Sequence, residues 1–306
     1  MDILRPEIVF NFRRQVVDVP EPHCPNLQEA LSPPAVLTGR VAVITGGASG
    51  IGRATAILFA QYGARVFVGD FRLTEESRSE LTRLGIHAAA CDVRRIDELQ
   101  RLIDGSATAA GRLDILVNNA GIGMVKQIHE VSEEDWDNCL DTNFKAAFFG
   151  AKFAIPHLIA AGGGSIVNTA SNAGLLPRAH DPVYSISKLA LVGLTKSLAL
   201  CHAKDRIRVN AVCPGPVGDT GMMNADLAAA VDRDATIKQF LSASPLANAH
   251  GRMIRPDEVA QAILYLVSDA ACMVTGTAVA IDGGKSMATA VPVTMQAASL
   301  TRYRMA

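Results

Sequence analysis

The sequence predicts an α/β fold, a single domain built on a doubly wound parallel sheet with helices on both faces. Two observations predict it. Short, almost continuously apolar segments alternate along the chain with longer segments of helical pattern. The first apolar segment also runs into a glycine-rich turn that opens a helix. Because no break in the alternation is long enough for a second domain, one domain accounts for the pattern.

The apolar segments set the expected strands, and local signals set the ends of several helices. Gly63 ends the first helix, Ser132 and Asp135 form a capping pair, and Pro256 stands in a first turn. The expected strands cover residues 41–44, 65–69, 87–91, 114–117, 165–168, 206–212 and 277–281. The expected helices cover 51–62, 74–84, 96–110, a segment that starts near 132, 184–200 and 256–266.

The two ends of the chain differ from this pattern. Residues 1–36 contain six prolines, which predicts an irregular arm. The domain is expected to span 37–287, with a variable lid at about 215–251. Residues 288–306 are weakly patterned and are expected to form a C-terminal tail.

Composition excludes several classes of protein. Hydrophobic residues make up 49% of the 306 residues, charged residues 19%, and the net charge is −1, which argues against nucleic-acid binding. The six cysteines form no CxxC pair, so we expect no metal site and a reducing compartment. No apolar segment is expected to approach the roughly 18 residues that span a membrane. With no secretory signal in the sequence, we expect a cytoplasmic protein.

The glycine-rich turn predicts a dinucleotide site. The first strand continues into Thr45-Gly46-Gly47-Ala48-Ser49-Gly50-Ile51-Gly52, which opens the first helix. Glycines let a pyrophosphate approach the backbone, and the helix N-terminus supplies N–H donors. A glycine-rich segment is often only a loop, but here a strand precedes it and a helix follows, as the motif requires.

The residues after the second strand bear on the choice of cofactor. That strand ends at Asp70, whose carboxylate can accept hydrogen bonds from ribose hydroxyls and repel a 2′-phosphate. The alternative is a solvated acid at a strand end. Arg72 could accommodate a 2′-phosphate, whereas position 49 is Ser and adds no second cation. We therefore expect NAD, with NADP as the alternative.

Tyr184 and Lys188 are candidates for proton transfer. They stand at positions i and i+4, on one face of an expected helix. A phenol with a pKa near ~10 is a weak base at neutral pH. A neighbouring ammonium is expected to lower that pKa, and Lys188 could also hold ribose hydroxyls. The YxxxK spacing also occurs by chance on many helices.

Two polar residues strengthen this interpretation. Ser171 follows the 165–168 strand and could hydrogen-bond the substrate oxygen and orient it towards Tyr184, although a serine there is often only a turn residue. Asn143 falls inside an expected helix, where asparagine is a mediocre helix former. It could hold a water that links Lys188 to solvent, or it could be a polar core group that distorts the helix.

With these residues in place, the chain resembles a short-chain dehydrogenase/reductase of the classical type over residues 36 to 287. The matching residues are Thr45–Gly52, Asp92, Asn118–Gly121, Asn143, Ser171, Tyr184–Lys188, Pro214-Gly215, Arg255–Ala260, Val274–Gly276 and Asp282–Gly284. The resemblance implies a single Rossmann domain with about seven parallel strands. It also implies a homo-oligomer, often a tetramer, with interfaces on the helices near 140–160 and 184–200 and on the last strand.

The resemblance also assigns roles to residues. It implies a catalytic tetrad of Asn143, Ser171, Tyr184 and Lys188. The segment after Pro214-Gly215 would close over the nicotinamide, but it is one residue longer than usual, which puts Val217 and Thr220 in doubt. The expected cofactor contacts are Gly46, Ser49, Gly50, Ile51, Gly52, Asp70, Asp92, Val93, Asn119, Ala120, Gly121, Tyr184, Lys188, Pro214, Gly215, Val217 and Thr220.

The sequence thus predicts an NAD(P)-dependent oxidoreductase that interconverts a secondary alcohol and a ketone, with Tyr184 as general acid and base. Apolar residues near the tyrosine and in the lid, such as Leu175, Leu176 and Phe240, favour a hydrophobic or cyclic substrate, although they could equally form the lid's own core. An NADP-dependent 3-oxoacyl or ketone reductase is the alternative enzyme. A non-catalytic dinucleotide-binding protein is the remaining alternative.

Overall fold

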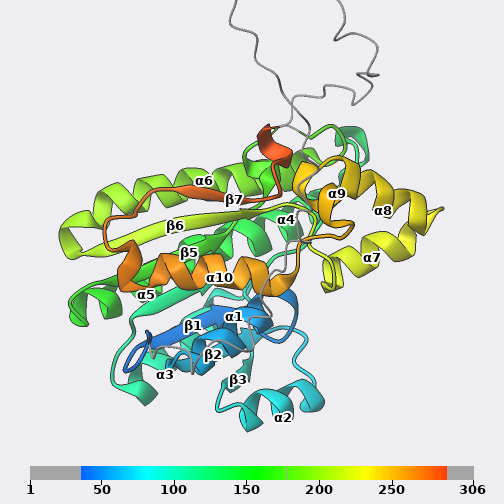
Figure 1. Ribbon diagram of the computed structural model, residues 1–306. Coiled ribbons are helices and arrows are strands. Elements are labelled where there is room, and N and C mark those ends of the chain that lie inside the picture. The colour runs from blue at the N-terminus through cyan, green and yellow to red at the C-terminus, as the bar shows by residue number, and fades with distance from the viewer. Residues whose placement is uncertain (1–35, 177, 288–306) are drawn as a thin grey trace, which may run out of the picture. The chain divides into compact units, whose positions relative to one another are not determined.

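In the computed structural model of the chain, the described residues are 36–176 and 178–287, and they contain one seven-stranded parallel sheet (Figure 1). The strand order is β3-β2-β1-β4-β5-β6-β7, which confirms the predicted doubly wound fold. Except for residue 36, the arm predicted for 1–36 and the tail predicted for 288–306 lie outside the described residues. The strands are β1 Val41–Thr45, β2 Arg65–Asp70, β3 His87–Ala90, β4 Ile115–Asn118, β5 Gly164–Thr169, β6 Ile207–Pro214 and β7 Ala278–Ile281.

Strand β1 shows why the apolar segments are continuous. All five of its residues are buried, and Ala42 and Ile44 pack in one core cluster while Val41 and Val43 pack in the other. Successive side chains of a strand point to opposite faces, so a strand covered on both sides needs apolar residues throughout. The alternation predicted from sequence therefore comes from a sheet enclosed between two layers of helices.

Each face of the sheet has its own helices. One core cluster contains Phe59, Leu81 and Ile263, and the other contains Leu99 and Leu158. Figure 1 shows α10 beside α1 along the sheet, where the two helices pack together. The first cluster uses α1 Gly50–Gln61, α2 Glu75–Arg83 and α10 Pro256–Val267, and the second uses α3 Ile96–Ala110, α5 Ala146–Ala160 and α6 Pro182–His202.

The segment predicted to be a lid follows the carboxyl end of β6. It holds three short helices, which Figure 1 shows gathered at one end of the described residues, away from α2. They are α7 Gly221–Ala229, α8 Arg233–Ser242 and α9 Pro245–His250. The remaining α-helix of the described residues, α4 Glu133–Leu140, begins at Ser132, whose hydroxyl accepts the Asp135 N–H in the predicted capping box.

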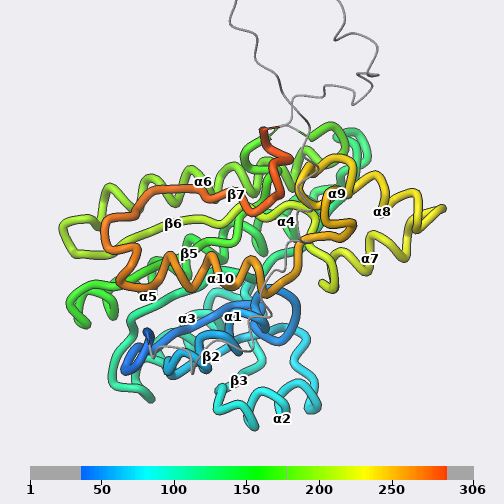
Figure 2. Tube along the Cα trace, viewed as in Figure 1, coloured from blue at the N-terminus to red at the C-terminus, as the bar shows by residue number. Residues whose placement is uncertain are grey.

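Helix α6 corrects one expectation drawn from composition. The segment Pro182–Asp205 is long and apolar enough to cross a membrane by length and composition alone. It meets this criterion because leucine, alanine, valine and isoleucine predominate in it and charged residues are few, Lys188 being the first. In the fold α6 packs along β6, as Figure 2 shows, so its apolar face belongs to the core.

Candidate active site

The sheet reverses its order between β1 and β4, and a set of hydrogen bonds joins the two strand ends there. The Thr45 hydroxyl accepts the Asn119 N–H at 3.0 Å and the Ala120 N–H at 3.1 Å. The Asn119 amide donates back to the carbonyls of Thr45 and Gly46, both at 3.0 Å. Ligands of this fold bind in the crevice at such a reversal. Here these hydrogen bonds hold the ends of β1 and β4 together.

The glycines of the loop leave room for a close approach of backbone. Gly46 has φ +66°, a conformation that other residues rarely adopt. A Cβ at Gly52 would lie 2.1 Å from the Gly46 carbonyl oxygen and 2.4 Å from the Asn119 amide nitrogen. Both positions thus require glycine, which is what the predicted dinucleotide loop needs.

Helix α1 begins directly behind this loop. Ser49 is its N-cap with extended φ and ψ, and its exposed side chain makes no capping hydrogen bond within the described residues. Gly50 follows with φ +52°, and a Cβ there would lie 3.3 Å from the Thr220 methyl carbon. The first N–H groups of α1, the helix dipole and the glycine cradle fit a bound pyrophosphate. Thr220 thus lies beside the loop, and its contact with the cofactor remains a prediction.

Asp70, the residue predicted to bind ribose hydroxyls, contacts the glycine loop. One carboxylate oxygen accepts the Ala48 N–H at 3.0 Å, and the other accepts the Arg72 N–H at 2.8 Å. Each oxygen can accept a second hydrogen bond, so the arrangement still fits ribose hydroxyls. Its role as a cofactor contact remains a prediction.

Asp92 has a neighbour that the sequence did not reveal. The Arg94 guanidinium donates to its carboxylate, with the closest pair at 2.7 Å, and holds the pKa of Asp92 below its usual range. The same guanidinium donates to Asn138 at 2.9 Å and lies 5.3 Å from the ring centre of Phe71. Asp92 is therefore half of an ion pair, and its contact with the cofactor remains a prediction.

Several predicted cofactor contacts have side chains that pack inside the protein. Val93 and Val217 are each 6% exposed, and Ile51 of α1 packs against the core. Pro214 ends β6, and a Cβ at Gly215 would lie 3.0 Å from Asp282. At these positions only backbone groups remain for a ligand, and their contact with the cofactor stays a prediction.

Tyr184 and Lys188 lie together on the buried face of α6. Tyr184 is 8% exposed and Lys188 is 3% exposed. The Lys188 ammonium donates to the Thr169 carbonyl at 3.0 Å and lies 5.7 Å from the centre of the Tyr184 ring. A Cβ at Gly121 would come within 3.3 Å of that ammonium, so the strand end after β4 closes over it.

Burial moves the pKa values of these two groups in opposite directions. It raises the pKa of Tyr184 above 10, against the opposing effects of the nearby Ser171 hydroxyl and of Arg178. It lowers the pKa of Lys188 to about 8. The expected lowering of the tyrosine pKa by Lys188 is not seen in the structure, because loss of hydration outweighs the neighbouring charges.

Asn143 lies in a turn of π-helix, Asp141–Lys145, between α4 and α5. Its amide donates to the Ile122 carbonyl at 3.0 Å and to the Ser187 hydroxyl at 3.1 Å, and its oxygen accepts the Ile122 N–H at 2.8 Å. The helix is thus distorted at Asn143, and the side chain fixes the loop that follows β4. Such turns occur often at functional sites.

Ser171, the fourth predicted tetrad residue, lies just after the end of β5. It is 6% exposed, accepts the Ala173 N–H at 3.1 Å and donates to the Asn172 amide oxygen at 3.3 Å. The four residues predicted as a tetrad are therefore buried together at the carboxyl edge of the sheet.

Sequence reasoning missed the residues that hold the site in place. Thr45, Ser187, Thr169 and Asn172 supply a hydroxyl or carbonyl to the hydrogen bonds described above. Thr45 carried a signal, since it is a polar residue that ends an apolar strand just before a glycine. Thr169 carried none, because it contributes only its backbone carbonyl.

The fold and this site define a class of protein, the dinucleotide-dependent oxidoreductases with a Rossmann fold. A family model described as enoyl-(acyl carrier protein) reductase matches residues 46–286. Together with the relatives below, this match shows that the chain belongs to the short-chain dehydrogenase/reductase family, whose members use NAD or NADP.

Three similar proteins illustrate the range of the family. Cis-4-hydroxycyclohexanecarboxylate dehydrogenase of Sinomonas cyclohexanicum is 40% identical over 249 residues, 80% of this chain and 96% of that protein. The 3-oxoacyl-[acyl-carrier-protein] reductase of Thermotoga maritima is 37% identical over 254 residues, 81% of this chain and 98% of that protein. The crystal structure of levodione reductase superimposes with a TM-score of 0.76 at 28% identity, covering 82% of this chain and 99% of that one.

Gly52→Ala should weaken cofactor binding, because the new Cβ would displace the Gly46 carbonyl or the Asn119 amide. Overpacking of this size costs about 1–3 kcal/mol, so we expect the Kd for NADH to rise on the order of 10- to 100-fold in fluorescence titration. Gly105→Ala in α3 is the control, since a Cβ there meets nothing within 4 Å. Equal NADH affinity of wild type, Gly52→Ala and Gly105→Ala would contradict the prediction that the glycine loop binds the cofactor.

Lys188→Met tests the burial of the ammonium through stability. An unfolded lysine titrates near 10.5, whereas burial lowers the pKa of Lys188 to about 8 in the folded chain. Between these values the unfolded state holds more protons, so wild-type stability rises relative to the variant as pH increases from 8 to 10.5. The Tm of the variant minus that of wild type should therefore be largest at pH 7 and shrink by pH 10.

The control for this measurement is Lys196→Met, which removes an exposed ammonium from the same helix. It should change Tm little, and by the same amount at every pH. A Lys188→Met difference that stays constant from pH 7 to pH 10 would show that burial does not depress this pKa.

Proposed function

We propose that this protein is an NAD-dependent oxidoreductase that interconverts a secondary alcohol and a ketone. The observation that carries the proposal is the convergence of Tyr184, Lys188, Asn143 and Ser171 at the carboxyl edge of the sheet, beside the glycine cradle. A bound nicotinamide would supply the hydride acceptor in oxidation and the hydride donor in reduction. The protein groups bind, orient and move the proton.

Each residue of the group has a defined task in this proposal. The Tyr184 hydroxyl gives its proton to the ketone oxygen in reduction, and its phenolate takes the alcohol proton in oxidation. Ser171, beside it, holds the substrate oxygen. Lys188 stabilises the phenolate by its charge and holds ribose hydroxyls. Asn143, fixed by Ile122 and Ser187, keeps the β4 loop in place and anchors the water that replenishes the proton.

The proposed substrate is a hydrophobic or cyclic alcohol or ketone. Leu175 and Leu176 directly follow the η3 turn, Asn172–Gly174, and Met222 lies in the first turn of α7. Leu175 and Met222 are 37% and 38% exposed. Two relatives support a ring substrate, because one is named for a hydroxycyclohexanecarboxylate and the other for levodione. A panel of alcohols and ketones followed by NADH absorbance tests this proposal.

The second candidate is an NADP-dependent 3-oxoacyl or ketone reductase. Arg72 favours this candidate, because its side chain is exposed and could accommodate a 2′-phosphate, while its backbone N–H donates to Asp70. The similarity to the acyl-carrier-protein reductase of Thermotoga maritima favours it as well.

Asp70 separates the two candidates through cofactor affinity. We expect wild type to bind NADH more tightly than NADPH, because the carboxylate repels a 2′-phosphate. Asp70→Ser should improve the affinity for NADPH relative to NADH by roughly tenfold, the equivalent of about 1.4 kcal/mol of repulsion removed. Tighter binding of NADPH by wild type in the same titration would favour the second candidate.

Tyr184→Phe tests the acid and base directly. Loss of the hydroxyl removes general acid–base catalysis, so kcat should fall by roughly 10²–10⁴-fold while the Kd for NADH stays nearly unchanged. Tyr265→Phe on α10 is the control, because Tyr265 is 49% exposed and remote from α6. A Tyr184→Phe enzyme with wild-type turnover would remove Tyr184 from the proposed mechanism.

A further inference from the structure

Among the residues that the structure describes, two cations lie beside the Tyr184 ring, and the proposed reaction uses only one of them. The Lys188 ammonium and the Arg178 guanidinium carbon each lie 5.7 Å from the ring centre. Lys188 is 3% exposed, whereas the Arg178 side chain is 40% exposed. Arg178 therefore lies on the solvent-exposed side of the proposed acid and base.

Arg178 is held in place by an internal carboxylate. Its Nη2 lies 2.9 Å from one oxygen of Asp181, and the other oxygen accepts the Ser185 hydroxyl at 3.0 Å. The Asp181 side chain is 2% exposed and immediately precedes α6, the helix that carries Tyr184. The ion pair thus fixes the guanidinium relative to the reacting hydroxyl. A guanidinium has five N–H donors, so this pairing leaves donors for a second partner.

We propose that Arg178 binds a carboxylate of the substrate, so that the protein acts on hydroxy acids and oxo acids in preference to uncharged alcohols and ketones. This inference rests on the proposed function and narrows its substrate class. It adds a charged anchor to the hydrophobic ring site, at the end of the substrate remote from the reacting carbon.

Besides Asp181, two described residues of the lid and the C-terminal turn interact with the Arg178 charge, and they have opposite effects on an anion. Lys285, in the η6 turn Lys285–Met287, feels both Arg178 and Asp181, and burial lowers its pKa. Asp226 of α7 faces Arg178 from the lid, and burial raises the pKa of its carboxyl group. Lys285 would reinforce the attraction of an anion to Arg178, and Asp226 would weaken it.

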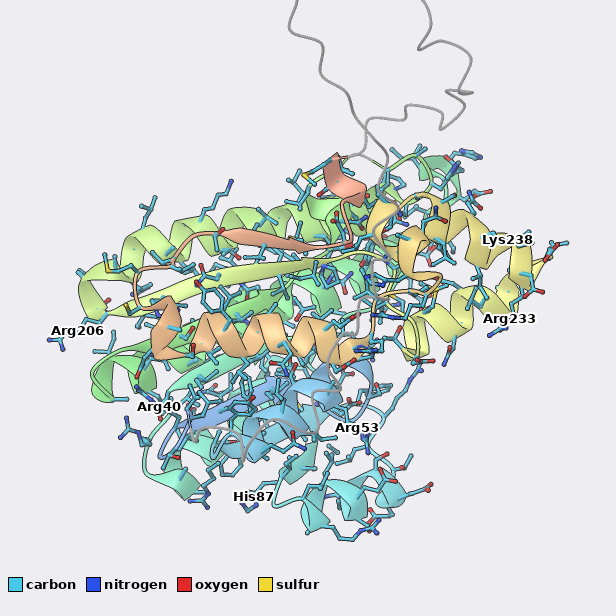
Figure 3. All side chains as sticks on the ribbon, in the orientation of Figure 1. Arg40, Arg53, His87, Arg206, Arg233 and Lys238 are labelled. Atoms are coloured by element: carbon cyan, nitrogen blue, oxygen red, sulfur yellow. The ribbon has the colours of Figure 1, made fainter. Side chains whose placement is uncertain are left out.

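The cations of the outer lid are poor candidates for the same task. Figure 3 shows Arg233 and Lys238 on α8 projecting at the far edge of the lid, away from the sheet. Arg178 is also the arginine whose charge acts directly on Tyr184. A planar guanidinium recognises a carboxylate with two parallel N–H bonds, which fixes orientation as well as affinity.

The experiment compares an acid with its neutral analogues. NADH formation is measured with cis-4-hydroxycyclohexanecarboxylate, with its methyl ester and with cyclohexanol, for wild type and for Arg178→Gln. We expect wild type to prefer the acid and Arg178→Gln to lose roughly 10- to 100-fold in kcat/KM for the acid, mainly through KM. Because the Arg178 charge also lowers the pKa of Tyr184, the kcat/KM for the ester should fall as well, but by no more than about threefold and through kcat rather than KM.

Asp226→Asn provides a variant with the opposite expected sign. Removal of this carboxylate should lower KM for the acid and leave the ester unchanged. An equal loss for acid and ester in Arg178→Gln would overturn the proposal, because Arg178 would then act on Tyr184 or on the fold. A wild-type enzyme that turns over the ester and cyclohexanol as well as the acid would also overturn it, while leaving the proposed function standing.

A binding measurement separates this proposal from the proposed function. In the presence of NADH, cyclohexanecarboxylate should raise the Tm of wild type more than cyclohexanecarboxamide does, and Arg178→Gln should abolish the difference. If NADH binds but no alcohol or ketone of the panel reacts, the proposed function fails, and this Tm difference still decides the role of Arg178. Equal shifts for acid and amide in wild type would overturn the carboxylate site.

Discussion

The buried ammonium of Lys188 is the constraint on which the arrangement of the site depends. A charge taken out of water is destabilising unless it finds partners, and here it has the Thr169 carbonyl and the face of Tyr184. The loop after β4 must also approach closely at Gly121, where the side chain of Asn143 lies 3.1 Å from the position of a Cβ. Burial of one lysine thus links α6 to the ends of β4 and β5.

The π-helical turn at Asn143 is part of the same constraint. Residues 141–145 form a π-helical turn, which is wider than a turn of α-helix. In this turn the Asn143 amide group hydrogen-bonds to Ile122 and Ser187. Ser187 in turn donates to the Tyr184 carbonyl at 2.7 Å, so the hydrogen bonds return to the helix that carries the acid and base. The distortion is stabilised by fully paired polar groups, which is the condition for keeping them buried.

The sequence predicted the sheet and the members of the site better than it predicted how they are held. The strand Val41–Thr45 could be predicted from its sequence because burial on both faces makes the segment almost continuously apolar. The loop could be predicted from Gly46 and Gly52 because only glycine fits at these positions. The hydrogen bond from Lys188 to the Thr169 carbonyl could not be predicted from the sequence, because every residue has a backbone carbonyl. The ion pair of Asp92 with Arg94 and that of Arg178 with Asp181 depend on side-chain directions, which a spacing does not give.

The electrostatics of the site also differ from what the YxxxK spacing suggested. Burial raises the pKa of Tyr184 above 10 and lowers that of Lys188 to about 8, so the same loss of hydration favours the neutral form of both groups. Burial therefore disfavours the phenolate form of Tyr184. Within the proposed function, this shift favours Tyr184 as the acid of ketone reduction. Its action as a base requires further positive charge nearby, and Arg178 on the open side already contributes in that direction.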